Sequence, residues 1–516
     1  MQAAMEAAKT QGISVALLSK TSPLRSTTGC TGGGINAVLQ ENQTGDSLGQ
    51  YEQDTVTGSG FLADPDAVRY FVEHAAEAVA ELDGFGVPFF RDSDGFIAQR
   101  KGGGASFPRV SLTHGHSIAH TLYEQLLRTR VTELAGQCLL ELVVKDGAIH
   151  GVISYDINTG KVVPIAAKAV IIATGGYGRI YWMRTTTPVG CTGDGIAACL
   201  NAGIPFKDPE FVQFHPTALA DSGILISEGA RSEGGRLYNV LGERFMERYA
   251  PESMEVSTRD LVSFAIEKEI SEGRGYGQGM AAHVMLDLRH LGAKKILEKL
   301  AQVYNTSVKF AGIDPSAEMI PIRPGAHFVM GGIDVIDYRT CATVVSGLFA
   351  AGECACVSVH GANRLGGNAL TELLVFGKVA GASAVQHVLN SQSSNREAVI
   401  KASERWRSKD PGLKNQHLFP QLVEIRNRLA ATMWNKAGIV RNGTGLCEAV
   451  SELNDLQEEY GTFEAGPYGQ KGDMEFVYYL GVRCKTPDLS PFKYVTGIFS
   501  VGNVRMQFEN RKATPF

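Results

Sequence analysis

The 516-residue sequence lacks the features that mark membrane-spanning, nucleic-acid-binding and secreted proteins. Its longest apolar runs, such as residues 168–174, are far shorter than the roughly 20 residues that span a bilayer. Any membrane association is therefore expected to be indirect. Lys and Arg total 49 against 54 Asp and Glu, a balance without the basic footprint of DNA-binding or RNA-binding proteins. No charged leader with an apolar core precedes the first structured segment, so we expect no secretion.

Cysteine is scarce and unpatterned. Its nine copies, an odd number, are scattered without a disulfide framework, which fits reduced thiols in a cytosolic compartment. Cys354 and Cys356 stand one residue too close for a C-x-x-C redox or zinc half-site. We interpret both as small buried side chains, and we expect neither a metal site nor an iron–sulfur cluster in this chain.

Glycine, by contrast, is plentiful, with 59 copies. Glycine clusters mark places where the backbone approaches a ligand closely or adopts positive φ. An ordinary turn explains any single cluster equally well, but several clusters directly follow short apolar strands, as in α/β nucleotide-binding folds. The clusters lie at 32–34, 102–104, 175–176, 234–235, 331–332 and 366–367.

The chain begins with a helical pattern over residues 1–10 and a buried parallel strand over 13–18. A helix leading into such a strand is the second half of a βαβ dinucleotide-binding unit. The first strand and the G-x-G-x-x-G turn of that unit are expected before Met1, where the sequence does not supply them. Either the start of the chain is truncated, which we favour, or cofactor binding is impaired.

Further along, the pattern alternates between strands and helices. Asp146-Gly147 predicts a hairpin turn between two strands. A region of mixed helices and loops over 205–320 indicates an inserted domain, and the apolar spacing over 393–460 indicates a separate helical domain. The predicted helices are 65–83, 116–134, 193–202, 416–434 and 445–459, and the predicted strands are 138–144, 149–156, 170–174 and 347–351.

Four loops carry side chains suited to a dicarboxylate, whose two anionic ends need cations or strong donors on both sides. Taken singly, each has a plainer explanation. Arg364 suits a surface salt bridge, His215 and His327 suit satisfied core histidines, and Arg259 suits an ion pair with Asp260 at a helix start.

Together, the order, wording and spacing of these stretches resemble the flavoprotein subunits of succinate dehydrogenase and fumarate reductase, from residue 1 to about 480. The resemblance implies an α/β fold with a Rossmann-like FAD-binding domain (1–204 and 321–392), an inserted α+β capping domain (205–320) and a C-terminal helical domain (393–480). Residues 481–516 form an unassigned tail without the Arg-Gly-Ala-His motif expected there. The stretches that carry the resemblance most strongly are 210–217, 223–231, 286–292, 360–372 and 433–441.

The resemblance implies roles for particular residues. Arg259 matches the residue that exchanges a proton with the substrate, and Glu228 and Arg231 match the relay that resupplies it. From chemistry alone Arg259 would be a clamp, because arginine stays protonated in proteins. The positions that match substrate-binding residues are His215, Ser227, His327, Arg364 and His116.

The resemblance also implies contacts to FAD, through loops whose glycines let backbone donors approach. Ser19 and Lys20 match the contact to the adenosine ribose, although the acidic residue commonly used there is absent. Without the resemblance, turns explain the glycines and a helix cap explains Asp194. The other implied contacts are Ser26, Thr27, Thr28, Gly32, Gly33, Gly34, Ala173, Thr174, Gly175, Asp194, Glu353, Asn368, Ala369 and Leu370.

Thr27 departs from the family pattern. Membrane-complex members of the family link FAD covalently through a histidine in an Arg-Ser-His-Thr run, whereas this sequence reads Arg25-Ser26-Thr27-Thr28. Threonine cannot form that bond. We therefore predict noncovalent FAD and a lower flavin potential that favours fumarate reduction over succinate oxidation.

Two alternatives stay open. L-aspartate oxidase shares the His-Pro-Thr and His-Gly-Ala-Asn-Arg elements and binds FAD noncovalently, and an inactive flavoprotein-like scaffold is a third possibility. If succinate and fumarate are the substrates, electrons are expected to pass through an iron–sulfur subunit, and from there to quinone through a membrane anchor or to a soluble donor. The expected location is cytoplasmic, peripheral on the membrane through partner subunits.

Overall fold

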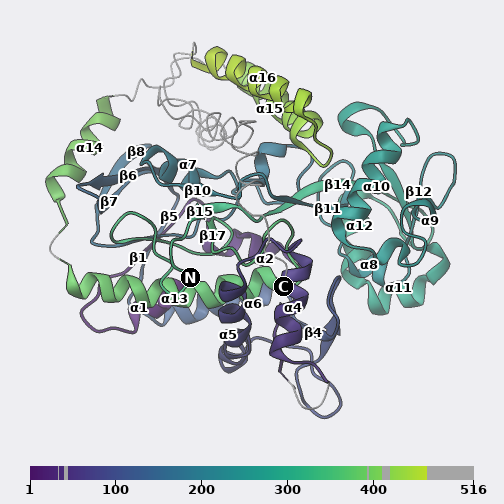
Figure 1. Cartoon of the computed structure of the whole chain (residues 1–516), viewed down its shortest axis with the longest axis horizontal. Helices are drawn as coiled ribbons and strands as arrows, with labels where there is room; N and C mark the ends of the chain where they lie inside the picture. The colour runs from purple at the N-terminus through teal and green to yellow at the C-terminus, as the bar shows by residue number, and fades with distance from the viewer. Residues whose placement is uncertain (33, 40–44, 392–393, 409–418, 462–516) are drawn as a thin grey trace.

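The computed structural model describes residues 1–32, 34–39, 45–391, 394–408 and 419–461 (Figure 1). Gly33, residues 462–480 of the predicted helical domain and the predicted tail lie outside the described residues. The elements of the first part are α1 (Gln2–Ala8), β1 (Ala16–Ser19), α2 (Thr27–Cys30), β2 (Ile35–Asn36), α4 (Leu48–Gly58), α5 (Pro65–Gly84), β3 (Gln99–Lys101), β4 (Pro108–Ser111), α6 (Gly115–Leu127) and β5 (Thr132–Ala135).

Two boundaries in this part differ from the predictions. Strand β1 begins at Ala16 because β5, its parallel partner, begins only at Thr132 opposite it. Helix α6 ends at Leu127 instead of residue 134, since a turn over 128–130 leads into β5. Helix α5 matches the predicted helix almost throughout, with Asp64 capping its first backbone N–H groups.

An antiparallel sheet confirms the predicted hairpin. Its strands are β6 (Gln137–Lys145), β7 (Ala148–Asp156) and β8 (Lys161–Ala166). Asp146 and Gly147 both adopt positive φ, +51° and +74°, as a two-residue hairpin turn of this type requires. Helix α14 (Arg396–Ser408) packs on this sheet, and the indole of its Trp406 donates to Glu141.

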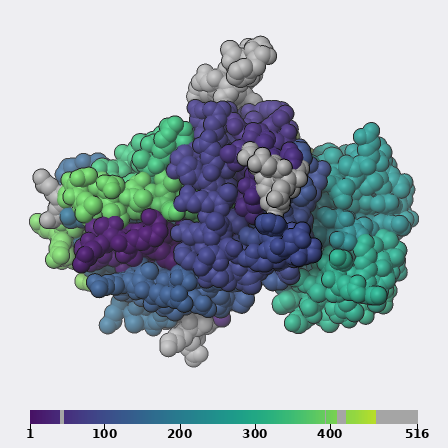
Figure 2. Space-filling view, turned by 90° about the horizontal axis from the view of Figure 1, so that it is seen from below, coloured from purple at the N-terminus to yellow at the C-terminus, as the bar shows by residue number. Residues whose placement is uncertain are grey.

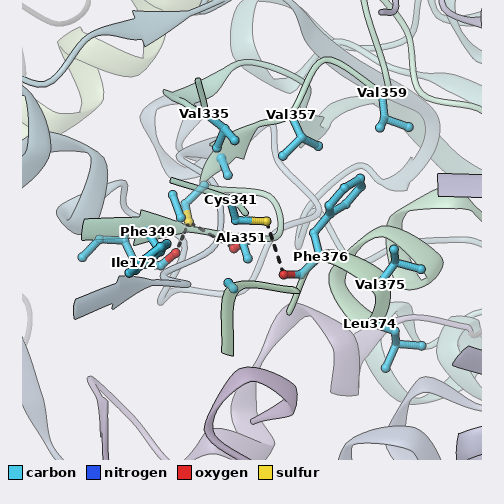
Figure 3. Packing of buried hydrophobic residues seen from close by; sticks show 14 of the residues in the cluster. Ile172, Val335, Cys341, Phe349, Ala351, Val357, Val359, Leu374, Val375 and Phe376 are labelled. Atoms are coloured by element: carbon cyan, nitrogen blue, oxygen red, sulfur yellow. Dashed lines mark hydrogen bonds between the residues drawn. The ribbon is translucent and has the colours of Figure 1, made fainter. Parts of the chain in front are cut away.

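Strands β9 and β16 pair in parallel within the main core (Figure 3). Its buried side chains include Ile172, Phe349 and Phe376, and the prediction that Cys354 and Cys356 are buried is confirmed. All described cysteines are free thiols. The elements here are β9 (Val170–Ile172), α7 (Asp194–Asn201), β10 (Phe206–Lys207), β15 (Gly332–Asp334), β16 (Leu348–Ala350), β17 (Ala355–Cys356) and α13 (Asn368–Asn390).

Helix α13 runs below these strands in the view of Figure 1 and packs along α1. A Cβ added to Gly381 would lie 2.5 Å from Ala3 O, so only glycine permits this approach.

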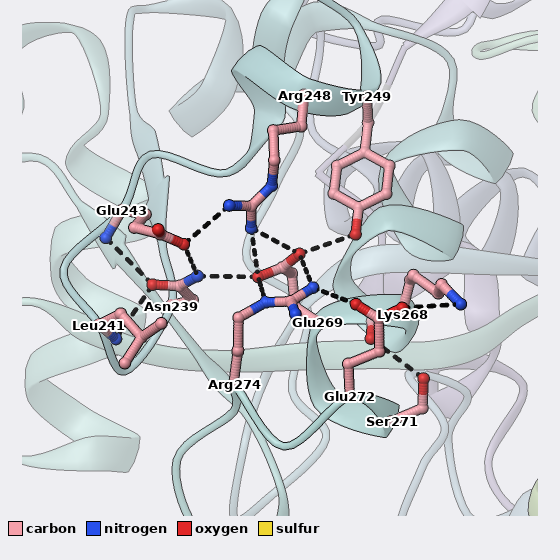
Figure 4. A network of polar contacts seen from close by, with 10 residues as sticks. All are labelled: Asn239, Leu241, Glu243, Arg248, Tyr249, Lys268, Glu269, Ser271, Glu272 and Arg274. Carbon is pink, nitrogen blue, oxygen red and sulfur yellow. Dashed lines mark hydrogen bonds and ion pairs between the residues drawn. The ribbon is translucent and has the colours of Figure 1, made fainter.

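The predicted inserted region forms a lobe with its own apolar core to one side of the molecule (Figure 2). Its four-stranded sheet has the order β11-β14-β13-β12. Buried Glu269 accepts hydrogen bonds from several neighbouring side chains there (Figure 4). The elements are β11 (Val212–Leu219), α8 (Gly229–Ser232), β12 (Arg236–Tyr238), α9 (Met246–Tyr249), α10 (Arg259–Ser271), β13 (Val284–Asp287), α11 (Ala293–Lys299), α12 (Ala301–Ala311) and β14 (Ile320–Val329).

The last two described helices, α15 (Phe419–Ala437) and α16 (Gly443–Gly461), pack against each other. Their core includes Trp434 and Leu453, and it reaches Tyr181 and Phe214 of the preceding elements. Helix α14 lies well apart from this pair in Figure 1. No described helix combines the length and the apolarity needed to cross a membrane.

Candidate active site

One large cavity, about 1970 Å³ in volume, runs from β1 and α2 to the strands β11 and β14. It brings together loops from both ends of the predicted FAD-binding region and from the predicted capping region. The predicted site residues that line it are Ser19, Lys20, Ser26, Thr27, Thr28, Gly32, Gly34, Ala173, Thr174, Gly175, Asp194, His215, Ser227, Glu228, Arg259, His327, Glu353, Arg364, Ala369 and Leu370.

The end of the cavity near β1 fits a dinucleotide. Lys20 forms an ion pair with Asp194 and donates to Thr192 Oγ1 at 2.5 Å, so a cation and its acidic partner lie together beyond the end of β1. Ser26 Oγ is buried without a hydrogen-bond partner in the described part of the chain. Such an orphaned hydroxyl is suited to a bound polar group. The Gly34 backbone, with φ of +141°, leaves no room for a Cβ, which would meet Val110 Cγ1 at 2.7 Å.

Thr27 lies beside a cysteine that sequence reasoning did not single out. Its Oγ1 lies 3.1 Å from Cys191 Sγ, and both residues line the cavity. Burial raises the pKa of the Cys191 thiol to about 12, so the sulfur stays protonated at neutral pH.

Glu353 lies on the cavity wall between the two ends. Its Oε1 accepts from the Val329 backbone N–H at 3.1 Å. Burial raises the pKa of this carboxyl to about 7, with the Val329 hydrogen bond acting in the opposite direction. A carboxyl in this state can donate as well as accept a hydrogen bond near neutral pH.

At the other end, Glu228 joins two arginines. Its Oε2 lies 2.9 Å from Arg259 Nε and 3.7 Å from Arg231 Nη2, and its Oε1 accepts from the Gly103 backbone N–H at 3.2 Å. Burial raises the pKa of Glu228, but the two arginines outweigh it and hold that pKa at about 2. The carboxylate is therefore ionised throughout the physiological range.

Arg231 lies behind this pair, away from the cavity surface. Its side chain is 1% exposed, and its Nη1 donates to Glu255 O at 2.6 Å. Burial lowers the pKa of the guanidinium to about 10. The plainer explanation of Arg259, an ion pair with its neighbour Asp260, does not hold, because Arg259 pairs with Glu228 instead.

Two histidines face each other across β11 and β14, with His215 and His327 ring centres 5.1 Å apart. Burial lowers both pKa values well below the ordinary value, so both rings are neutral. His215 Nδ1 accepts from the Thr217 backbone N–H at 3.2 Å, which puts the proton of the neutral ring on Nε2. His327 Nδ1 shares a 2.7 Å hydrogen bond with Thr186 Oγ1.

Arg364 is buried beside these histidines. Burial lowers the pKa of its guanidinium to about 9, and the positive charge of nearby Arg259 acts in the same direction. Its guanidinium stacks on the Phe328 ring, with Cζ 4.5 Å from the ring centre. His360, in the same loop, is held by Glu372 at 3.0 Å and packs edge-on against Phe328. Arg364 Nε is buried with no hydrogen-bond partner in the described regions.

The structure does not place every predicted residue at the cavity. His116 is exposed, and its ring lies against that of His120 with the planes tilted by 53°, four residues along α6 and so on the same helix face. His114, just before α6, lines the cavity instead. Asn368 is fully buried behind the wall, where its Oδ1 accepts from Asn36 Nδ2 at 2.6 Å and Tyr51 OH at 2.9 Å.

Sequence reasoning also missed Gln213, which lies between Arg259 and Arg364 and hydrogen-bonds to both. The signal was present in the run 211–217, where Gln213 stands two residues before His215 on the same strand. No cluster of three or more His, Cys, Asp or Glu side chains in the described ranges is arranged to hold a metal ion.

Comparison with known proteins places these residues in a family. The FAD binding domain family matches residues 1–370. The chain is 43% identical over 456 residues to the 8-methylmenaquinol:fumarate reductase flavoprotein subunit of Wolinella succinogenes, covering 88% of this chain and 74% of that protein. It is 38% identical over 469 residues to the succinate dehydrogenase flavoprotein subunit of Rickettsia bellii, covering 87% and 78%.

Among solved structures, a quinol-fumarate reductase with menaquinol molecules matches with a TM-score of 0.87 and 34% identity, over 98% of this chain and 88% of that one. The fold, the sequence and the residues of the cavity therefore indicate the same family. The chain belongs to the family of FAD-dependent oxidoreductases formed by the flavoprotein subunits of succinate dehydrogenase and fumarate reductase.

Proposed function

We propose that this chain interconverts succinate and fumarate, with a bias toward fumarate reduction. The observation that carries the proposal is the placement of Arg364, the Arg259–Glu228 ion pair and the two neutral histidines around one end of the cavity. This set offers donors for two carboxylates and a separate, carboxylate-linked arginine for proton exchange. The names of the relatives support the same pair of substrates.

In this proposal the dicarboxylate is held by Arg364, His215, His327 and Ser227. His215 donates from Nε2, because its Nδ1 already accepts from the Thr217 N–H. The Arg364 guanidinium offers the planar fork that pairs with a carboxylate. Holding both ends fixes the two central carbons relative to the rest of the cavity. FAD, when bound, supplies or accepts the hydride.

Arg259 exchanges the proton. In the reducing direction it gives a proton to the substrate carbon that does not receive the hydride, which completes succinate. Glu228, 2.9 Å from Arg259 Nε, stabilises the charged guanidinium and passes a proton back to it. Arg231 contacts the same Glu228 oxygen from the far side, and burial lowers the pKa of its guanidinium to about 10, which makes it easier to deprotonate than an exposed arginine.

We propose that FAD binds noncovalently along the rest of the cavity. Lys20 and Asp194 lie beyond β1, where the adenosine ribose is expected, and Ser26, Thr28 and the glycines at 32 and 34 border the middle. Gly175, Glu353 and Ala369 border the flavin end. Thr27 has only a weakly nucleophilic hydroxyl where the family's covalent members have histidine, and the lower potential of an unattached flavin favours fumarate reduction.

The chain is further proposed to act as one subunit of a larger assembly. Electrons would pass through an iron–sulfur subunit to a quinone-binding membrane anchor or a soluble donor on the cytoplasmic side. For the chain itself we propose an FAD-binding domain over 1–204 and 321–392, a capping domain over 205–320 and a helical domain formed by α15 and α16, since α14 packs on the β6-β7-β8 sheet instead.

One experiment tests the proposal. Recombinant protein is assayed for bound FAD by its absorbance after denaturation, and for fumarate-dependent oxidation of reduced methyl viologen. We expect wild type to bind FAD and to reduce fumarate, and we expect Arg259→Met to lose fumarate turnover. Turnover of L-aspartate with oxygen would identify an L-aspartate oxidase, and a protein that binds no flavin would identify a scaffold.

A further inference from the structure

Gln213 occupies the space between the two guanidiniums of the site. Its Oε1 accepts from Arg364 Nη2 at 3.0 Å and from Arg259 Nη1 at 3.2 Å. The side chain is 4% exposed. A single uncharged oxygen therefore bridges two like charges in a buried setting, and its lone pairs satisfy one donor of each arginine.

The orientation of this oxygen is fixed from the other end of the side chain. Gln213 Nε2 donates to Asn363 Oδ1 and to Arg364 O, both at 2.7 Å. Two carbonyl oxygens thus hold the amide nitrogen in the loop that carries Arg364, which leaves Oε1 pointing between the guanidiniums. Irregular pairing of β11 with β14 begins at Gln213, whose register partner is Phe328, the residue on which Arg364 stacks.

Arg364 contrasts with Arg259 in its partners. Arg259 has an ion pair with Glu228, whereas Arg364, within the described residues, hydrogen-bonds to no carboxylate. Its contacts are the neutral oxygens of Gln213 and Leu365 and the face of the Phe328 ring. These partners orient the guanidinium without cancelling its charge, so its attraction for an anion is preserved.

We propose that Gln213 is a positioning residue that sets the spacing of Arg364 and Arg259 while leaving the charge of Arg364 for a substrate carboxylate. The inference rests on the proposed function. A carboxylate in place of the amide would have the same shape, but it would lose the two hydrogen bonds that Nε2 donates, pair with both arginines and compete with the substrate. Neutrality at this position, and not only shape, is therefore the property that dicarboxylate binding requires.

The test compares Gln213→Glu, Gln213→Met and wild type, with Gln421→Glu on the exposed surface of α15 as a control for the added charge. Binding of malonate, a dicarboxylate that cannot be dehydrogenated, is measured by calorimetry. The apparent KM and kcat for fumarate and the Tm are measured in parallel. We expect Gln213→Glu to weaken malonate binding and raise KM at least tenfold, with a Tm no lower than that of Gln213→Met, since both variants lose the two hydrogen bonds that Nε2 donates.

For Gln213→Met we expect a smaller loss of malonate affinity but a lower kcat, because the arginines keep their charge and lose their spacing. Equal malonate affinity in Gln213→Glu and wild type would overturn the inference, as would weaker binding in Gln213→Met than in Gln213→Glu. Failure of wild type itself to bind malonate or reduce fumarate would instead count against the proposed function, so the two failures are distinguishable.

Discussion

Glu228 and Arg259 line the cavity together as an ion pair, with 2.9 Å between Oε2 and Nε. The two residues come from different elements, Arg259 from the start of α10 and Glu228 from the turn before α8. The same carboxylate contacts buried Arg231. Under the proposed function, these contacts form the path by which protons reach Arg259.

Replacement of Glu228 by Gln tests this path. The amide keeps the shape of the side chain but cannot carry a proton between the arginines, so we expect fumarate reduction to fall about 100- to 10,000-fold. Malonate affinity should change little, because the carboxylate-binding residues are untouched. Steady-state kinetics and calorimetry measure the two effects, with Glu247→Gln on the exposed face as control. Activity close to wild type would exclude Glu228 from the relay.

Replacement of Arg364 by Lys tests the carboxylate clamp. Lysine keeps the charge but loses the planar fork and the stacking on Phe328, so we expect malonate to bind about 10- to 100-fold more weakly. The comparison variant is Arg405→Lys, whose ion pair with Glu141 is exposed. If calorimetry gives the same affinity for Arg364→Lys and wild type, charge alone holds the substrate and the fork geometry does not matter.

The parts of the fold that follow from local chemistry were predictable. Asp146-Gly147 specifies its hairpin because both positions need positive φ, and Asp64 caps α5 within its own sequence neighbourhood. The pairing of Arg259 was not predictable from its surroundings. Sequence proximity favours Asp260, whereas the folded chain supplies Glu228, thirty-one positions earlier, at 2.9 Å.

The site residues also differ in whether the sequence could predict them. His215, His327 and Arg364 stand in distinctive runs, so the resemblance could locate them. Gln213 shares such a run, but its role depends on contacts to Arg259 and Arg364 that only the tertiary structure brings together. The prediction that His116 lies at the site was wrong, because the sequence does not indicate which side of the first turn of α6 faces the cavity.

Glu269 is predicted to hold the capping lobe together (Figure 4). Its side chain is 0% exposed and pairs with Arg274 and Arg248 at 2.8 and 2.9 Å. Replacement by Ala removes an acceptor that the two arginines share with Asn239 and Tyr249, so we expect a loss of about 1–3 kcal/mol in unfolding free energy. Denaturant unfolding measures the loss, and Glu272→Ala, at the exposed end of the same network, should cost far less.

The same residue predicts a pH effect. Burial raises the pKa of Glu269, but its hydrogen bonds outweigh burial and hold the pKa at about 2, below the ordinary value of 4.5. The unfolded chain therefore binds this proton first as pH falls, and the contribution of Glu269 is present above pH 4.5 and lost between 4.5 and 2. Wild type and Glu269→Ala should converge in stability across this window, and a constant difference would contradict the assignment.

The attachment of the flavin gives the last prediction. Thr27 and Cys191 lie in contact, and neither is suited to form a bond to the flavin. The threonine hydroxyl is a weak nucleophile, and burial keeps the Cys191 thiol protonated. We therefore expect acid precipitation of the FAD-loaded protein to leave a colourless pellet and all flavin in the supernatant, with Thr27→Ser behaving alike. A yellow pellet would contradict noncovalent binding. If its colour were then lost in Cys191→Ser but kept in Thr27→Ser, the bond would belong to the cysteine, and the argument for a low potential based on Thr27 would fail with it.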